Sequence, residues 1–189
     1  LGDKRRSGGG PLSDRGVQVI DPTRWVMGNP KPVSVYGATF HKLGNRKGLK
    51  ESVGYTSVSK SDDDICDVED LASALVRYEN GAVLSVEASF CLNLKNDIGK
   101  VELFGTRGGM SLDPELEIYT DNCGYLTNLS LNKSTALNFD GLFEREINYF
   151  VGAVRKGTDI NSIAEDGVTI MKILDAVYLS AKTGKSVNI

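Results

Sequence analysis

Residues 71–90 read LASALVRYENGAVLSVEASF, and this stretch decides which fold class the chain adopts. Two apolar runs, 71–78 and 82–90, lie on either side of Glu79-Asn80-Gly81. Asn-Gly is the strongest short-range signal for a tight β-hairpin, because both residues accept a positive φ. The stretch therefore predicts two antiparallel strands joined by a short turn.

Further strand patterns lie on both sides of this hairpin. Residues 33–40 alternate with a period of two, which is typical of a half-buried strand. Downstream, Thr106-Arg107-Gly108-Gly109 separates two more short apolar runs. Strands in such close succession, with short turns between them, predict an antiparallel sheet. The remaining predicted strands are residues 101–105, 110–112, 116–119, 125–129 and a last short one at 187–189.

A helix is predicted before the first strand. Residues 1–10 end in three glycines and are predicted as a flexible lead-in. Pro11 then suits the first position of a helix, where a missing N–H costs nothing. Inside that helix, Pro22 would remove one backbone hydrogen bond and clash with an earlier carbonyl, at about 3 kcal/mol. We therefore expect either a kink at Pro22 or a restarted helix with Asp21 as its N-cap.

Two amphipathic helices close the chain, and Gly157 and Gly184 end them. Ser162 and Glu165 form a capping box at the start of the second helix. Each helix has an apolar stripe, which predicts a face packed into the core. The stripes are Phe143, Ile147, Phe150, Val151 and Val154, and then Ile170, Met171, Leu174, Val177, Tyr178 and Ala181. Helices on both sides of a run of strands indicate an α+β fold, an open-faced, mostly antiparallel β-sheet with helices on one face, in one domain over residues 1–189.

The composition excludes several classes of protein. With 40% hydrophobic residues in a chain of 189, a packed core is expected and global disorder is not. No apolar run reaches the ~18–20 residues that span a bilayer, so we predict no membrane partner. Residues 1–60 carry 11 Lys/Arg against 4 Asp/Glu, but no aromatic side chains interleave them, so we predict no nucleic-acid partner. Because the chain begins with Leu1, we expect it to be part of a longer protein.

The cysteine and histidine content limits the chemistry. Cys66, Cys91 and Cys123 are odd in number and include no Cys-x-x-Cys, so neither a disulfide framework nor a zinc site is expected. Reduced thiols are typical of the cytoplasm, which is the predicted compartment. His41 is the only histidine, so no catalytic triad or multi-histidine metal site is available within this chain. Residues 41–50 are predicted as a solvated loop.

The glycine-rich segment does not match a nucleotide loop. No Gly-x-Gly-x-x-Gly follows a strand and opens a helix in this sequence. The N–H groups of Gly8-Gly9-Gly10 precede a helix, so they have two interpretations. They could hold an anion, or they could form a tight entry to the helix, which is the interpretation we favour.

A set of polar residues follows this glycine segment. Asp14, Gln18, Asp21 and Trp25 are spaced by four, three and four residues, which places them on one face of a helix. Such a face is either solvated or the polar wall of a cleft. In the second case Asp14 lies in the first turns, where the helix dipole stabilises a carboxylate.

Five motifs together resemble a known family. They are Gly8-Gly9-Gly10-Pro11-Leu12-Ser13-Asp14-Arg15-Gly16-Val17-Gln18-Val19-Ile20-Asp21 with Trp25 and Gly28-Asn29-Pro30; Asp67-Val68-Glu69-Asp70-Leu71-Ala72; Tyr78-Glu79-Asn80-Gly81-Ala82; Glu102-Leu103-Phe104-Gly105-Thr106; and Ala164-Glu165-Asp166-Gly167. In this order they resemble the C-terminal domain of the glucose–fructose oxidoreductase, inositol dehydrogenase and MocA (Gfo/Idh/MocA) family. The resemblance covers nearly the whole chain.

The resemblance implies a two-domain NAD(P)-dependent oxidoreductase that acts on a sugar, a polyol or a related compound. In such proteins a separate N-terminal Rossmann domain binds NAD or NADP and supplies a lysine. Residues 1–189 would then be the substrate-binding and oligomerisation domain, which binds no cofactor by itself and is inactive when isolated. The bare sheet face would make a homodimer or a tetramer, since a large uncovered face is an apolar patch.

The resemblance also implies roles for three residues. Asp14 falls on the catalytic aspartate, and Gln18 falls where the family usually has a histidine that removes the substrate hydroxyl proton. Glutamine has no proton-accepting state at usable pH. Arg15 stands at a position that is more often apolar, and it is expected either to bind substrate or to face solvent. The departure at Gln18 leaves an alternative, a sugar-binding or assembly protein that has lost hydride transfer.

Overall fold

The structure is a computed structural model, and it describes residues 2–44, 65–112, 116–130, 141–160 and 163–189. The chain divides into two compact units. One unit joins Leu1–Leu94 with Ala164–Ile189, and the other is Lys95–Ile163. Each is described by itself.

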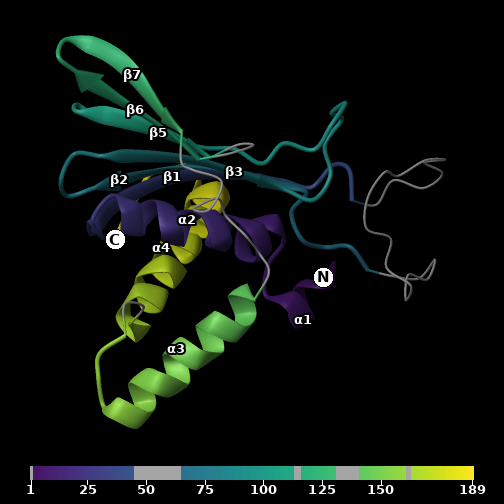
Figure 1. Cartoon of the computed structure of the whole chain (residues 1–189). Helices are drawn as coiled ribbons and strands as arrows, with labels where there is room; N and C mark the ends of the chain where they lie inside the picture. Colours follow the sequence, from purple (N-terminus) through teal and green to yellow (C-terminus); the bar gives the residue numbers. More distant parts are fainter. Residues whose placement is uncertain (1, 45–64, 113–115, 131–140, 161–162) are drawn as a thin grey trace. The chain divides into compact units, whose positions relative to one another are not determined.

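The first unit is built on an antiparallel sheet in the order β3-β2-β1-β8 (Figure 1). Its strands are β1 (Pro32–Phe40), β2 (Leu71–Tyr78), β3 (Val83–Ser89) and β8 (Val187–Asn188). Its helices are α1 (Lys4–Ser7), the π-helical turn η1 (Leu12–Gly16), α2 (Val17–Val26) and α4 (Ala164–Thr183). The predicted α+β fold is confirmed, with two four-stranded antiparallel sheets in place of one.

The predicted hairpin is confirmed in its register. β2 and β3 pair from Leu71 with Ser89 to Arg77 with Val83. Gly81 closes the turn with φ of 85°, a conformation that glycine adopts without a steric penalty. The two apolar runs with Asn-Gly between them therefore predicted the correct pair of strands.

One face of this sheet is packed and the other is open. Val35 of β1 and Val76 of β2 are fully buried, and α2 and α4 lie against that face in Figure 1. Gly37 lets α4 come close, because a Cβ there would lie 2.7 Å from Cγ1 of Val177. Side chains on the opposite face are exposed, namely Tyr36 by 53% and Leu75 by 50%. The buried hydrophobic core is Leu12, Ile20, Val35, Ala72, Ala74, Val76, Tyr78, Val86, Ile170, Ile173, Leu174, Ala176 and Val177.

The helix before β1 differs from the prediction at Pro22. α2 runs through Pro22 to Val26, so the predicted restart at Asp21 is wrong. Tertiary contacts offset the lost backbone bond. Arg24 is buried, and its guanidinium forms an ion pair with Asp166 of α4 at 2.8 Å. Residues 1–10, predicted as a flexible lead-in, contain α1 and two buried glycines.

The second unit holds the sheet β4-β5-β6-β7 and one helix. Its strands are β4 (Val101–Phe104), β5 (Gly108–Leu112), β6 (Leu116–Asn122) and β7 (Tyr125–Ser130), and the helix is α3 (Leu142–Lys156). Each of its predicted strands is found. α4 begins at Ala164, whereas the capping residue Ser162 lies outside the described residues, as do residues 45–50 of the predicted loop.

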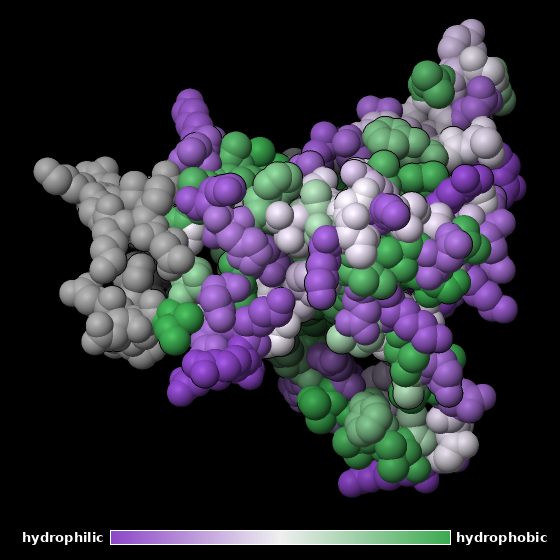
Figure 2. Space-filling model, turned by 180° about the vertical axis from the view of Figure 1, so that it is seen from behind, coloured by the Kyte–Doolittle hydropathy of each residue, from purple (hydrophilic) through white to green (hydrophobic). Residues whose placement is uncertain are grey.

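The apolar stripe of α3 is not a core face, which corrects the prediction. Phe143 is 75% exposed, Ile147 61% and Val154 66%. In Figure 2, hydrophobic residues, drawn in green, gather on the segment that is α3 in Figure 1. A stripe in the sequence determines that a helix has an apolar face, but not what covers it. In the α4 stripe, by contrast, Ile170, Leu174 and Val177 are buried as predicted. Met171, predicted in the same stripe, is 54% exposed, which corrects that part of the prediction. No helix in the described ranges is long and apolar enough to cross a membrane.

Candidate functional site

The predicted site residues lie at the start of one continuous helix, residues 11–26. Its first part, η1, is a π-helical turn that contains Asp14 and Arg15. Gln18 follows in the first turn of α2. Turns of π geometry inside α-helices are rare and often occur at functional sites. The carboxylate of Asp14 is therefore presented by an unusual stretch of backbone.

The glycines before this turn are required by close contacts. A Cβ at Gly10 would lie 2.7 Å from the carbonyl oxygen of Glu69 and 2.8 Å from its Cδ. A Cβ at Gly9 would lie 2.4 Å from both Oγ of Ser13 and the hydroxyl oxygen of Tyr178. Real Cβ atoms essentially never approach so closely. Of the two interpretations of this segment, the structure supports the tight helix entry.

The anion at this helix entry is the protein's own Glu69. This carboxylate is 3% exposed and accepts hydrogen bonds from the backbone N–H of Gly10, at 3.1 and 3.2 Å, and of Leu12, at 3.2 Å. Free N–H groups at a helix start attract negative charge. Glu69 meets that need from 59 residues away, so these amides are not available to a phosphate.

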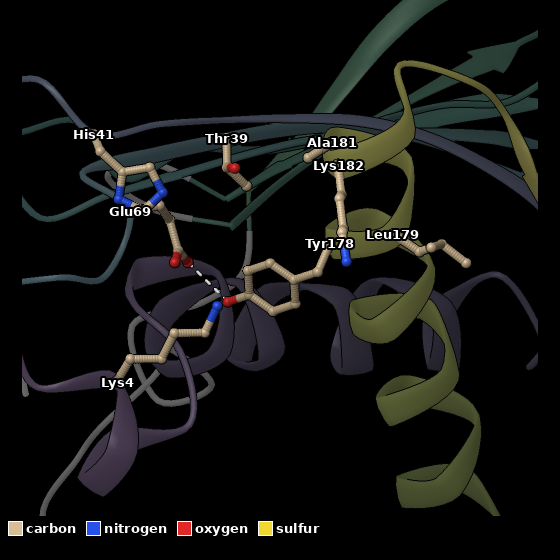
Figure 3. A pocket seen from close by; sticks show the side chains of 8 residues that line it. All are labelled: Lys4, Thr39, His41, Glu69, Tyr178, Leu179, Ala181 and Lys182. Carbon is tan, nitrogen blue, oxygen red and sulfur yellow. Dashed lines mark hydrogen bonds between the residues drawn. The ribbon is translucent and has the colours of Figure 1, made fainter.

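Tyr178 of α4 completes the network around Glu69. Its hydroxyl donates to Oε1 of Glu69 at 2.8 Å and lies 3.0 Å from Oγ of Ser13. Figure 3 shows the phenol ring pointing toward the carboxylate. Burial raises the pKa of Tyr178 to about 12, and the Glu69 hydrogen bond acts in the same direction. The hydroxyl therefore stays protonated as a donor at neutral pH, and it ties η1 to α4.

The structure brings only two of the predicted site residues into contact. Nε of Arg15 lies 3.3 Å from Oδ2 of Asp14, and the two side chains are 67% and 35% exposed. Gln18 is exposed, and among the described residues its side chain has no hydrogen-bond partner. Asp21 and Trp25 are exposed as well. Asp14 and Gln18 thus lie on accessible surface, as a cleft wall or a solvated face would.

A second buried carboxylate, Asp70, holds the chain after β1. It accepts hydrogen bonds from the backbone amides of Lys42, Leu43 (2.5 Å) and Gly44 (2.6 Å). Burial acts to raise the pKa of Asp70, but these three hydrogen bonds and one from the Cys91 thiol together outweigh it and hold the pKa below its ordinary value. Successive N–H groups form such anion nests. Next to this nest, Nδ1 of His41 lies 2.9 Å from the carbonyl oxygen of Val68.

The described residues include no group of three His, Cys, Asp or Glu side chains that could hold a metal ion. Cys66, Cys91 and Cys123 form no disulfide with one another.

The network of Glu69, Tyr178 and Ser13 was missed by reasoning from the sequence. Glu69 was noted only as part of a motif, and Tyr178 only as part of a core stripe. The one sequence signal for a role of Glu69 is its position next to Asp70, directly before the strand that begins at Leu71. Its partners lie 57–59 and 109 residues away, so nothing local identifies them.

Comparison with known proteins places the chain among oxidoreductases. Residues 2–189 match the family model of the Gfo/Idh/MocA C-terminal domain, described as the oxidoreductase family, C-terminal alpha/beta domain. D-glucoside 3-dehydrogenase of Escherichia coli (strain K12) is 31% identical over 188 residues, covering 99% of this chain and 51% of that protein. D-xylose 1-dehydrogenase (NADP(+)) 2 of Haloferax volcanii is 25% identical over 186 residues, covering 96% and 48%. The chain therefore spans about half the length of the curated relatives it matches.

Solved structures share the fold. Levoglucosan dehydrogenase in complex with NADH and levoglucosan superposes with a TM-score of 0.78 at 21% identity, covering all of this chain and 52% of that one. An oxidoreductase domain protein from Kribbella flavida gives 0.77 at 22%, covering 100% and 53%. The family match over nearly every residue, together with the antiparallel α+β fold, shows that this chain belongs to the Gfo/Idh/MocA oxidoreductase family and corresponds to its C-terminal α/β domain.

Proposed function

We propose that this chain is the substrate-binding and oligomerisation domain of an NAD(P)-dependent oxidoreductase that acts on a sugar, a polyol or a related compound. The relatives named above support the substrate class, because their names state D-glucoside, D-xylose and levoglucosan as substrates or ligands. The single observation that carries the proposal is the π-helical turn that presents Asp14, which is anchored through Leu12 to Glu69 and through Ser13 to Tyr178.

The cofactor is proposed to bind outside this chain. A nicotinamide dinucleotide needs a phosphate loop, and the N–H groups of Gly10 and Leu12 are already bonded to Glu69. We therefore assign the cofactor to an N-terminal Rossmann domain and not to the described residues. When bound, the nicotinamide would accept a hydride from the substrate carbon. By itself, residues 1–189 would bind no NAD(P) and show no dehydrogenase activity.

Within this chain, Asp14 is proposed to orient the substrate and take part in moving its hydroxyl proton. The positive end of a helix attracts a carboxylate, and carboxylate oxygens accept hydrogen bonds from sugar hydroxyls. Arg15, paired with Asp14 at 3.3 Å, is proposed as a substrate-binding cation beside it. Gln18 cannot take a proton but can donate and accept hydrogen bonds to a hydroxyl. Proton removal would then depend on Asp14 or on a group of the Rossmann domain.

Gln18 also supports a second candidate function. If no residue replaces the missing general base, a rate loss of ~10²–10⁴-fold is typical. The parent would then be a sugar-binding or assembly protein that has lost hydride transfer.

A panel of variants in the whole protein separates the two functions. Nicotinamide reduction is followed with D-glucosides, D-xylose, levoglucosan and inositol, with NAD and NADP in turn. For the oxidoreductase, Asp14→Asn lowers kcat by about 10²–10⁴-fold. Arg15→Gln raises KM at similar kcat. Asp175→Asn, at an exposed aspartate of α4 away from the polar face of Asp14 and Gln18, is the matched control and keeps full activity.

Two results decide between the candidates. No nicotinamide binding by calorimetry, and no turnover on the panel by wild type or Gln18→His, would reject the oxidoreductase and leave the binding protein. Robust turnover by the wild type would reject the binding protein.

Self-association through the open sheet face is part of the proposal. Tyr36 and Leu75 pair across β1 and β2 and are about half exposed on that face. Arg77 is exposed on the same side of β2. A homodimer or a tetramer would cover this patch, and a strictly monomeric mass in light scattering at high concentration would refute it. We also propose a cytoplasmic location, because Cys66, Cys91 and Cys123 form no disulfide with one another.

A further inference from the structure

The first unit contains a cavity that the proposed function does not use. Its volume is about 380 Å³, within the range of small-ligand sites. The side chains that line it include Lys4, Thr39, His41, Glu69, Tyr178 and Lys182, shown in Figure 3. Asp14, Arg15 and Gln18 are not among its lining residues.

Two lysines give the cavity a positive wall. Lys4 reaches in from α1 and lies 5.7 Å from the centre of the Tyr178 ring, a cation–π distance that positions its ammonium. Lys182 enters from the last turn of α4. Neither ammonium has an acidic partner within ion-pair distance among the described residues. Their charge is therefore free to meet an anion.

The one carboxylate in the wall is largely committed to the protein. Glu69 accepts bonds from Gly10, Leu12 and Tyr178, which spread its charge over a helix start. Oε1 receives three of these bonds, whereas Oε2 receives only the one from Gly10. Oε2 thus retains acceptor capacity for a hydroxyl.

Two further groups in the wall suit hydroxyls. Thr39 has a side-chain hydroxyl with no hydrogen-bond partner among the residues described. His41 uses Nδ1 toward the carbonyl of Val68, which leaves Nε2 available to a ligand. The wall therefore combines a cationic side with a side that donates and accepts hydrogen bonds.

We infer that this cavity binds a small polyhydroxylated anion, of the sugar phosphate or sugar acid class. The phosphate or carboxylate lies between Lys4 and Lys182, and the hydroxyls meet Oε2 of Glu69, Thr39 and Nε2 of His41. Lys4 and Lys182 are exposed residues whose ammonium groups a neutral sugar would not pair, so the inferred ligand carries an anionic group. The inference does not depend on dehydrogenase activity, because its measurement is binding alone.

Calorimetry on the full chain at low salt tests the inference. The probes are D-glucose 6-phosphate and D-gluconate, which distinguish the phosphate source from the carboxylate source, with D-glucose and inorganic phosphate for comparison. At least one of the two sugar anions should bind, and Lys182→Gln should weaken it about tenfold, since a hydrogen bond to a charged group is lost. Lys172→Gln, an exposed lysine on the same helix outside the cavity, should leave the affinity unchanged.

Several outcomes would overturn the inference. One is that neither sugar anion binds. Another is that Lys172→Gln weakens binding as much as Lys182→Gln, which would indicate diffuse attraction to surface charge. A third is that D-glucose or inorganic phosphate binds as tightly as D-glucose 6-phosphate and D-gluconate, so that one half of the recognition is absent. Chemical shift changes confined to the Thr39, His41 and Tyr178 signals would locate the ligand independently.

Discussion

Glu69→Ala is the sharpest test of how the helix entry is held. The substitution removes the acceptor for the N–H groups of Gly10 and Leu12, and both residues are buried. Tyr178 loses one bond but keeps Ser13. Each buried amide left without a partner costs about 1–3 kcal/mol, so we expect the free energy of unfolding to fall by about 4 kcal/mol.

Urea unfolding followed by circular dichroism measures this loss. For an m-value of about 2 kcal/mol/M, a change of about 4 kcal/mol moves the midpoint down by about 2 M. Amide hydrogen exchange at Leu12 reads the same network locally and should accelerate in the variant. Glu69→Gln keeps the shape but places an amide N–H₂ against backbone donors, so its loss should be intermediate.

The matched control is Glu87→Ala on β3, where the side chain is exposed. Its free energy of unfolding should stay within about 0.5 kcal/mol of the wild type. If Glu69→Ala unfolds at the same urea concentration as Glu87→Ala, the carboxylate does not hold the helix entry and the argument fails.

Three further predictions concern pH and exposed apolar residues. Because burial raises the pKa of Tyr178 from 10 to about 12, its contribution to stability is complete below pH 10 and is lost between pH 10 and 12. In Tyr178→Phe the urea midpoint should therefore fall less between pH 10 and 12 than in the wild type. The fall that remains belongs to Tyr78, whose pKa burial likewise raises to about 12. Burial acts to raise the pKa of Asp70, but its hydrogen bonds, three of them from backbone amides, hold the pKa below the ordinary value. Its contribution to stability is therefore present at neutral pH and lost on acidification. Asp70→Asn should lower the urea midpoint at neutral pH and reduce its fall on acidification, and an unchanged fall in acid would contradict this. Phe143 and Ile147 are 75% and 61% exposed, so Phe143→Ala and Ile147→Ala should each change the free energy of unfolding by at most about 0.5 kcal/mol. A loss of about 3–5 kcal/mol, typical of a core phenylalanine, would show that the α3 stripe is covered.

The strands could be predicted because their signals are local. The apolar runs 71–78 and 82–90 and the turn at Asn80-Gly81 lie within 20 residues, so they predict β2 and β3 without the rest of the chain. The end of α3 at Gly157, with φ of 62°, is equally local. Such patterns depend on backbone geometry alone and survive in almost any surroundings.

The helix passing Pro22 could not be predicted in the same way. The penalty for proline inside a helix was known, but the ion pair of Arg24 with Asp166 joins residues 142 positions apart. Contacts of this kind override local propensity.

For the candidate site, too, some features follow from the local sequence and others only from tertiary contacts. The sequence by itself determined the family, the strand order along the chain and Asp14, Arg15 and Gln18 as the residues to examine. Only the tertiary structure decided that Gly10 must be glycine and that Glu69 caps the helix. It alone also showed that most of the α4 stripe is buried or partly buried, with Met171 exposed, while the similar α3 stripe is exposed. The physical reason is that burial and hydrogen-bond partners are properties of residues far apart in the chain, and a periodic pattern records which face is apolar without recording what lies against it.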